Sequence, residues 1–296
     1  MKILAKYIDI IVSLGYNNIR KRKGADILQR KEFQEKSFDG TILRVVKAVP
    51  ENSTGVVVVV HGLAEHLGRY EELAAVFNES QLAVYRFDHR GHGKSEGPRA
   101  YYRDFNEIIE DVNVVFELAR KENSGLPVFV LGHSMGGFAA ACFATKYPDK
   151  AAGIILSGAL TRDNRELLQG VGPELSATQY LPNSLGNLIC TDQAVVKAYM
   201  EDPLVLMEVS VGLFRALLAG IEWLKEHKRQ FTAPALLLHG CEDQLVSEQD
   251  SRELFGDIAS TDKELKIYAK LYHEILNEPR HPEIMAEIVA WINKHL

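Results

Sequence analysis

The chain has 296 residues and a net charge of −6, and 25% of its residues are charged while 46% are hydrophobic. This length suits one large α/β domain or two small ones, with room for a sizeable core. The negative net charge argues against a general nucleic-acid-binding protein. The three cysteines, Cys142, Cys190 and Cys241, are odd in number and widely spaced, which favours a reducing cytoplasm over a disulfide framework or a Cys-based metal site.

Residues 1–30 differ from the rest of the chain in their pattern. Apolar side chains recur there at helical spacing, at Ile3, Leu4, Tyr7, Ile8, Ile11 and Leu14. Lys6 and Asp9 interrupt the run, so neither a signal peptide nor a bilayer-spanning helix is indicated. We therefore predict an amphipathic helix followed by a basic cluster at 20–23. Residues 1–23 then either pack on the domain or bind an anionic lipid surface, as a peripheral contact of a cytoplasmic protein.

Strand and helix patterns alternate along most of the chain. The run GVVVVVHG at 55–62 is typical of a strand buried on both faces of a parallel sheet. The expected strands lie at 40–49, 55–62, 83–91, 128–131, 151–159, 233–240 and 264–273, and the expected helices lie at 69–80, 105–122, from 135, from 247 and at 282–296. This alternation predicts an α/β fold with a mostly parallel central sheet flanked by helices. Residues 31–159 and 233–296 form its core.

Residues 160–232 break the alternation. They show no convincing strand, and they are helical and rich in apolar side chains. Two interpretations remain open: a cap inserted between late strands, lying over the sheet edge where ligands bind, or a pair of scaffold helices that belong to the core. The length of the segment favours the cap.

The stretch GHSMGG places Ser134 at a joint. An apolar strand pattern ends just before it, and a helical pattern begins at Met135. Glycines at 132 and 136 would relieve the steric clashes of so sharp a turn. The turn would hold the serine hydroxyl at a helix N-terminus, which favours negative charge. A tight connection without chemistry is the alternative, so Ser134 needs partners before it can be interpreted as a nucleophile.

The later loops supply such partners. Glu242 and Asp243 follow the strand at 233–240, and either carboxylate could orient a histidine ring. His273 ends the next strand pattern, at 264–273, so the order serine, acid, histidine matches that of α/β-hydrolases. The N–H groups of Met135 and Leu63, the latter in the loop HGLAEH, would stabilise an oxyanion. The sequence therefore predicts a nucleophile elbow with a complete catalytic set.

Five blocks together resemble monoacylglycerol lipases and the related lysophospholipase-like serine hydrolases. They are HGLAEHLGRYEELA, FDHRGHGKSEGPR, GHSMGG, HGCEDQLV and YHEILNEP, and they span roughly residues 55–280. The resemblance implies an α/β-hydrolase core, a helical cap and no cofactor or metal. It implies Ser134 as nucleophile, Asp243 rather than Glu242 as acid, His273 as base, and Leu63 and Met135 at the oxyanion hole.

Other interpretations of the sequence motifs remain. Loop histidines at 61, 66, 89, 92 and 133 could hold a metal, but their spacing is irregular, and fixing turns is the more common role of such residues. GHGKSEG lacks the arrangement of a nucleotide-binding loop. The expected substrate is a small-molecule lipid ester, most simply a monoacylglycerol, and no nucleic acid. The alternatives are a short-chain carboxylesterase, a lysophospholipase, a thioesterase, or an inactive homologue that binds ligands.

Overall fold

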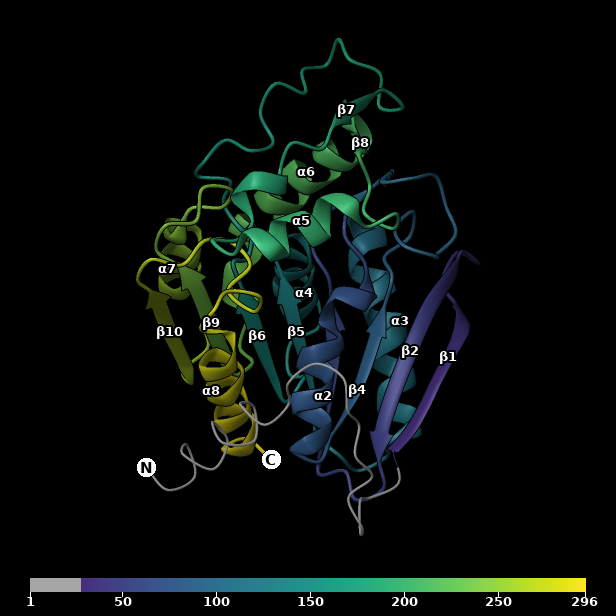
Figure 1. Cartoon of the computed structure of the whole chain (residues 1–296), viewed down its shortest axis with the longest axis vertical. Coiled ribbons are helices and arrows are strands. Elements are labelled where there is room, and N and C mark those ends of the chain that lie inside the picture. Colours follow the sequence, from purple (N-terminus) through teal and green to yellow (C-terminus); the bar gives the residue numbers. More distant parts are fainter. Residues whose placement is uncertain (1–27) are drawn as a thin grey trace.

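A computed structural model describes residues 28–296 and shows one large sheet crossing the molecule (Figure 1). Eight strands lie in the order β1-β2-β4-β3-β5-β6-β9-β10. Their bounds are β1 Leu28–Lys36, β2 Ile42–Pro50, β3 Gly55–Val60, β4 Leu82–Phe87, β5 Val128–His133, β6 Gly153–Ser157, β9 Ala235–Gly240 and β10 Lys263–Tyr268. All neighbours from β4 to β10 pair in parallel, while β1 and β2 pair antiparallel. The predicted, mostly parallel α/β sheet is confirmed.

Helices cover both faces of the sheet. They are α2 Glu71–Glu79, α3 Phe105–Glu122, α4 Met135–Lys146, α5 Gln193–Glu201, α6 Val211–His227, α7 Glu248–Asp257 and α8 His281–Asn293, with short 3-10 turns η1 Leu67–Tyr70, η2 Gly186–Leu188 and η3 Lys228–Gln230. One core cluster joins the sheet to α3, α4, α6 and α7, and a second joins it to α2 and α8. Every residue of β3, β4, β5, β6 and β9 is buried, as expected for strands covered on both faces. The parallel strands therefore end together at one edge.

Strand β1 was missed by the sequence analysis, which predicted no strand before residue 40. Its sequence, LQRKEFQEK, is mostly charged and exposed. It forms because its backbone pairs with β2 along all nine residues, and a charged edge strand also discourages pairing with other chains. Residues 28–30 of the predicted N-terminal segment thus belong to the sheet. The predicted helix and basic cluster at 1–27 lie outside the described residues.

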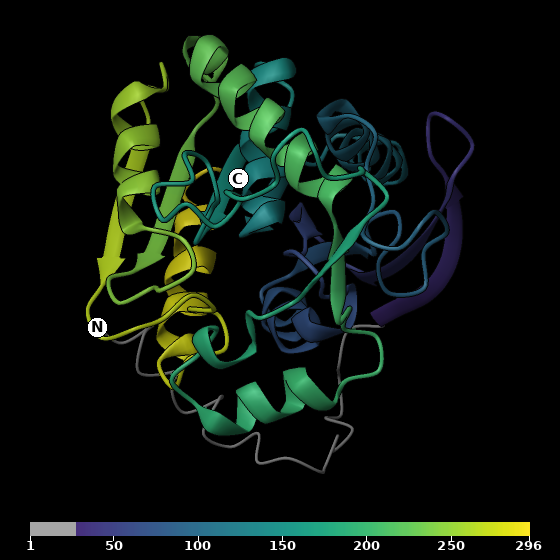
Figure 2. The ribbon, with the colours of Figure 1, turned by 90° about the horizontal axis from the view of Figure 1, so that it is seen from above.

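The segment 160–232 has two parts. Its first part, with α5 and a small antiparallel pair, β7 Tyr180–Pro182 with β8 Glu208–Ser210, lies over the carboxyl ends of the parallel strands (Figures 1 and 2). The expectation of no strand here was wrong, because two three-residue strands leave little periodic pattern. The second part, α6, packs on α3 and α4 of the core. Gly220 allows this approach, since a Cβ there would lie 2.3 Å from the Phe138 ring.

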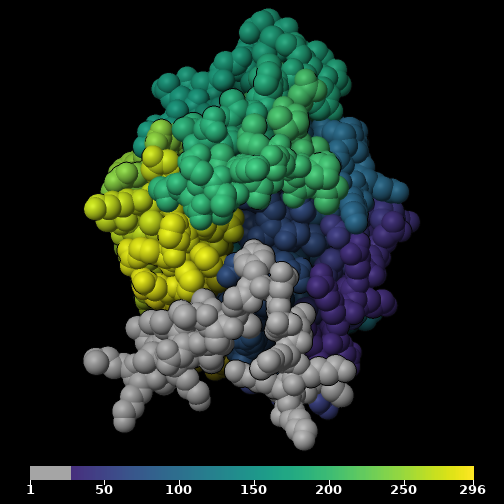
Figure 3. Space-filling view, in the orientation of Figure 1, coloured from purple at the N-terminus to yellow at the C-terminus, as the bar shows by residue number. Residues whose placement is uncertain are grey.

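In the space-filling view, the residues of this segment cover the upper end of the molecule (Figure 3). Within residues 28–296, no helix combines the length and the apolar character that crossing a bilayer requires.

Candidate active site

Ser134 occupies a strained turn between β5 and α4. Its φ of 54° and ψ of −116° place it in a region that non-glycine residues rarely adopt. A Cβ at Gly132 would lie 2.1 Å from the Gly136 carbonyl oxygen, and one at Gly136 would lie 2.1 Å from the Val60 carbonyl oxygen. Both positions therefore require glycine. The turn has the geometry of the nucleophile elbow that the sequence predicted, and Ser134 is 8% exposed.

His273 and Asp243 meet beside Ser134. The Nδ1 of His273 lies 2.6 Å from Oδ2 of Asp243, and both side chains are buried. Because a carboxylate can only accept here, Nδ1 donates, which leaves Nε2 as the basic nitrogen of a neutral ring. Burial lowers the pKa of His273, but the charge of Asp243 and its hydrogen bond outweigh burial and raise the pKa above 6.5. Ser134 and His273 line one cavity.

The Asp243 carboxylate accepts four hydrogen bonds. Its Oδ1 accepts the backbone N–H groups of Leu245 and Val246 at 2.8 and 2.9 Å, while Oδ2 accepts from His273 and from His239. Burial raises the pKa of Asp243, but the charge of His273 and the hydrogen bonds lower it well below its usual range. Asp243 is therefore ionised at neutral pH. Glu242, the alternative carboxylate, is exposed.

The two predicted oxyanion donors belong to the loop after β3 and to the start of α4. The Gly62 N–H donates to Oε1 of Glu65 at 2.5 Å and curls the loop after β3. Leu63, the next residue, lines the same cavity as Ser134 and His273. Met135 is the first residue of α4, so its N–H belongs to the helix terminus, where N–H groups have no partner within the helix.

A buried ionic cluster beside the site was not predicted. Arg69 contacts Glu65 at 2.8 Å and holds Glu274 through two bonds of 2.5 and 2.7 Å, and its guanidinium lies 4.9 Å from the centre of the Tyr199 ring. Burial raises the pKa of Glu65, but the charge of Arg69 outweighs burial and lowers it to about 2. Glu274 follows His273 directly in the chain, which was its only signal in the sequence. The cluster connects the loop after β3, the base-bearing loop and α5.

The loop histidines are held by hydrogen bonds within the fold. The Nδ1 of His61 donates to the Gly62 carbonyl at 2.7 Å, and its Nε2 accepts the His89 N–H at 2.9 Å. The Nδ1 of His133 donates to the Ser157 carbonyl at 3.0 Å. Among residues 28–296, no group of three or more His, Cys, Asp or Glu side chains is arranged to hold a metal ion. These rings therefore fix turns around the site.

The cavity at Ser134 is small. Its volume is about 20 Å³, roughly the space of one water molecule. The segment over the sheet supplies part of its lining, namely Leu185, Ile189 and Tyr199. Several contacts with the core hold this segment in place. Among them, His66 Nε2 lies 2.9 Å from Asp202 Oδ2, the Leu206 N–H donates to the Ala64 carbonyl at 2.8 Å, and the Glu274 N–H donates to the Ile189 carbonyl at 2.7 Å. The segment over the sheet therefore contributes apolar and aromatic side chains to the cavity at Ser134.

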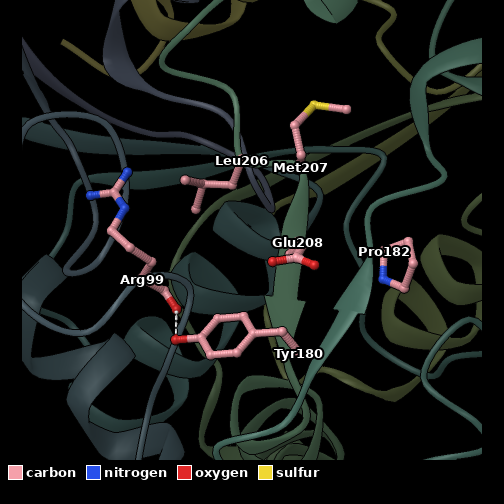
Figure 4. A pocket seen from close by; sticks show the side chains of 6 residues that line it. All are labelled: Arg99, Tyr180, Pro182, Leu206, Met207 and Glu208. Atoms are coloured by element: carbon pink, nitrogen blue, oxygen red, sulfur yellow. Dashed lines mark hydrogen bonds between the residues drawn. The ribbon is translucent and has the colours of Figure 1, made fainter.

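A larger hollow of about 420 Å³ lies between the same segment and Arg99 of the core (Figure 4). It is lined by Arg99, Tyr180, Pro182, Leu206, Met207 and Glu208, and the Tyr180 hydroxyl donates to the Arg99 carbonyl across it at 2.8 Å. Neither Ser134 nor His273 lines it.

Comparison with known proteins supports the resemblance read from the sequence. The family model of serine aminopeptidases, S33, matches residues 51–280. The monoacylglycerol lipase of Mycolicibacterium smegmatis is 37% identical over 82% of this chain and 89% of that protein, and the human monoglyceride lipase is 35% identical over 80% of each. The crystal structure of the Paleococcus ferrophilus monoacylglycerol lipase superposes with a TM-score of 0.74 at 29% identity, covering 91% of this chain and all of the other. The chain therefore belongs to the S33 serine aminopeptidase family and is a serine hydrolase of the α/β-hydrolase fold.

Proposed function

We propose that this hydrolase cleaves the ester bond of monoacylglycerols, releasing a fatty acid and glycerol. Ser134 is the nucleophile, His273 the base and Asp243 the acid that orients it, and the N–H groups of Leu63 and Met135 stabilise the oxyanion. The observation that carries the proposal is the bond of 2.6 Å between His273 and Asp243 beside a strained Ser134 that shares a cavity with His273. The similarity to monoacylglycerol lipases supports the choice of substrate.

The reaction proceeds in two stages. The Ser134 oxygen bonds to the ester carbon while its proton passes to Nε2 of His273, and the carbonyl oxygen becomes an oxyanion near the two N–H groups. The carbon–oxygen bond to glycerol then breaks, and His273 returns the proton to the leaving alcohol. Water attacks the acyl-serine by the same route and frees the fatty acid. Asp243 stabilises the imidazolium ion that forms in each stage.

The lining of the cavity supports a neutral, single-chain substrate. Leu63, Leu185, Ile189 and Leu245 offer apolar contact for an acyl chain. The polar side of the site instead holds the buried ionic cluster of two carboxylates, Glu65 and Glu274, against the single guanidinium of Arg69. This excess of negative charge disfavours an anionic head group such as a phosphate. The glycerol head group of a monoacylglycerol is uncharged, so these carboxylates do not repel it.

We further propose that residues 160–232 act as the cap that the sequence predicted, with α6 anchoring it to the core. The cap would open to admit the chain and close over it. Each buried methylene would then contribute up to about 0.8 kcal/mol.

The test of the proposed function is a rate comparison across substrates. A series of monoacylglycerols from short to long chains would be measured with a triacylglycerol, a lysophosphatidylcholine and a lysophosphatidic acid, below aggregation concentrations where possible. We expect kcat/KM to rise at least tenfold over the first added carbons and to level off when the pocket is full. Monoacylglycerols should exceed all three other lipids. A preference for acetate and butyrate esters would instead indicate a short-chain esterase, and faster lysophosphatidylcholine hydrolysis a lysophospholipase.

We also propose a peripheral contact with anionic membranes through residues 1–23 and the cap. The basic cluster at 20–23 would contribute about 1 kcal/mol per basic residue near such a surface, and Met200 and Met207 are exposed on the cap side, at 46% and 54%. The full chain should sediment with anionic vesicles and be released by salt. A truncation lacking residues 1–23 should lose binding and keep hydrolysis of a soluble ester. Equal sedimentation of both forms would leave these residues without a membrane role.

A further inference from the structure

A second histidine touches the proposed catalytic acid from behind. His239 lies near the end of β9, where it is the polar residue in the buried run ALLLHG. Its side chain is fully buried. Its Nε2 lies 3.1 Å from Oδ2 of Asp243 and 3.1 Å from the Val246 carbonyl, and its Nδ1 lies 2.8 Å from the Ser251 hydroxyl on α7. His239 is the first residue of the block HGCEDQLV, but the sequence analysis assigned it no role.

The partners of His239 determine its proton position. The Val246 carbonyl and the ionised Asp243 can only accept hydrogen bonds, so Nε2 must carry the proton. Nδ1 is then free to accept from the Ser251 hydroxyl. A neutral imidazole in this tautomer satisfies both of its nitrogens, as a buried polar ring requires. His239 is therefore built as a donor to Asp243.

Asp243 Oδ2 thus lies between two imidazole donors. His273 donates at 2.6 Å and His239 at 3.1 Å, while backbone N–H groups hold Oδ1. Without His239, the two backbone bonds on Oδ1 would remain, and the His273 bond alone would hold Oδ2. The carboxylate could then turn about Oδ1 and orient His273 less precisely. The geometry points to His239 as a positioning residue: we propose that its Nε2–H fixes Oδ2 of Asp243 so that the carboxylate holds the reactive tautomer of His273. This inference rests on the proposed roles of Asp243 and His273.

Paired variants separate donation from packing. His239→Gln retains an N–H donor at about the reach of Nε2, whereas His239→Leu retains an apolar bulk without a donor. Ser260→Ala removes another buried hydroxyl, which donates to the Asp262 carbonyl at 3.0 Å, and serves as the control for a loss of stability alone. All rates would be measured on a soluble ester and expressed per folded molecule.

We expect His239→Leu to lower kcat at least tenfold, short of the about 10⁴-fold cost of losing the acid function itself, with KM unchanged within twofold. His239→Gln should recover kcat to within a few-fold of the wild type, and Ser260→Ala should lower only the melting temperature. A wild-type kcat in His239→Leu would overturn the proposal. Equal losses of kcat in His239→Leu and His239→Gln would also overturn it, because the loss would then come from altered packing rather than from the missing N–H donor.

The pH profile provides a readout that packing alone would not move. His273 is faced by the charges of Asp243, Glu274 and Glu65 and by the His133 ring, and of these His239 contacts only Asp243. Since only the neutral base can accept a proton, wild-type kcat/KM should rise with pH through a limb above pH 6.5. In His239→Leu the midpoint of this rise in kcat/KM should shift down toward pH 6.5, because Asp243 stabilises the imidazolium of His273 less well. In His239→Gln the midpoint should remain at its wild-type pH.

A separate variant tests the assignment on which this inference depends. If Asp243→Asn retained wild-type kcat, the acid role itself would be wrong, whatever the His239 variants showed. If Asp243→Asn were inactive while His239→Leu kept the wild-type kcat and limb, only the role of His239 would fail.

Discussion

Ser134→Ala is expected to remove nearly all ester hydrolysis, lowering kcat by about five to six orders of magnitude. The alanine lacks the oxygen that bonds to the ester carbon, and what remains is binding and oxyanion stabilisation. His273→Ala should cost about as much, because nucleophile and base act as a unit. The measurement is the initial rate on a nitrophenyl ester, with the melting temperature recorded for each variant.

Thr145→Ala is the matched control for these variants. It also removes a buried hydroxyl, from the far end of α4, where the side chain donates only to the Ala141 carbonyl. We expect its rate to stay within a few-fold of the wild type. A His273→Ala protein that kept near-wild-type turnover would show that the base is another residue.

Gly136→Ala should be strongly destabilising. The added Cβ would lie 2.1 Å from the Val60 carbonyl oxygen and 2.5 Å from that of His61. Both are backbone atoms at the end of β3, so relief of the clash would displace the elbow or the oxyanion loop. We expect a loss of about 3 kcal/mol or more in the free energy of unfolding, together with loss of activity. Denaturant unfolding followed by circular dichroism measures the first.

Gly256→Ala is the control for that substitution. Gly256 lies near the end of α7, and a Cβ there would meet nothing within 4 Å. We expect this protein to be as stable as the wild type or up to about 1 kcal/mol more stable, because alanine restricts the unfolded chain and favours the helix. Equal stability of the two variants would mean that the elbow does not require glycine at 136.

The parallel core could be predicted because its signals are local. Strands such as β3 are short apolar runs, and helix α3 has the predicted bounds, with Asp104 accepting the Asn106 N–H at its start. The sequence also indicated that the loops carrying the proposed catalytic residues lie together, because the topology places the loops after β5, β9 and β10 at one edge. Some strand ends were misplaced. Strand β4 stops at Phe87 rather than at residue 91, and β10 stops at Tyr268, so His273 lies in a loop rather than at the end of a strand at 264–273.

The remaining features depend on contacts between distant residues. Strand β1 has no apolar pattern and owes its existence to β2. Arg69 and Glu274 are 205 positions apart in the sequence, so no local motif predicts their ion pair. The length of the segment 160–232 favoured a cap, but the packing of α6 on the core depends on the close approach of Gly220 to Phe138, which no local pattern shows. The role of His239 could not be inferred from its place in the block HGCEDQLV, because it depends on hydrogen bonds to Asp243, Val246 and Ser251.

The proposed function depends above all on acylation of Ser134 by a single-chain lipid ester. The most direct measurement is the mass of the Ser134 peptide after turnover of a long-chain monoacylglycerol is quenched in acid. The mechanism predicts a peptide carrying the acyl chain of the substrate, absent from Ser134→Ala and lost when the wild-type protein is left to complete turnover. Hydrolysis of the monoacylglycerol with the acyl group on another residue, or undiminished hydrolysis by Ser134→Ala, would contradict it.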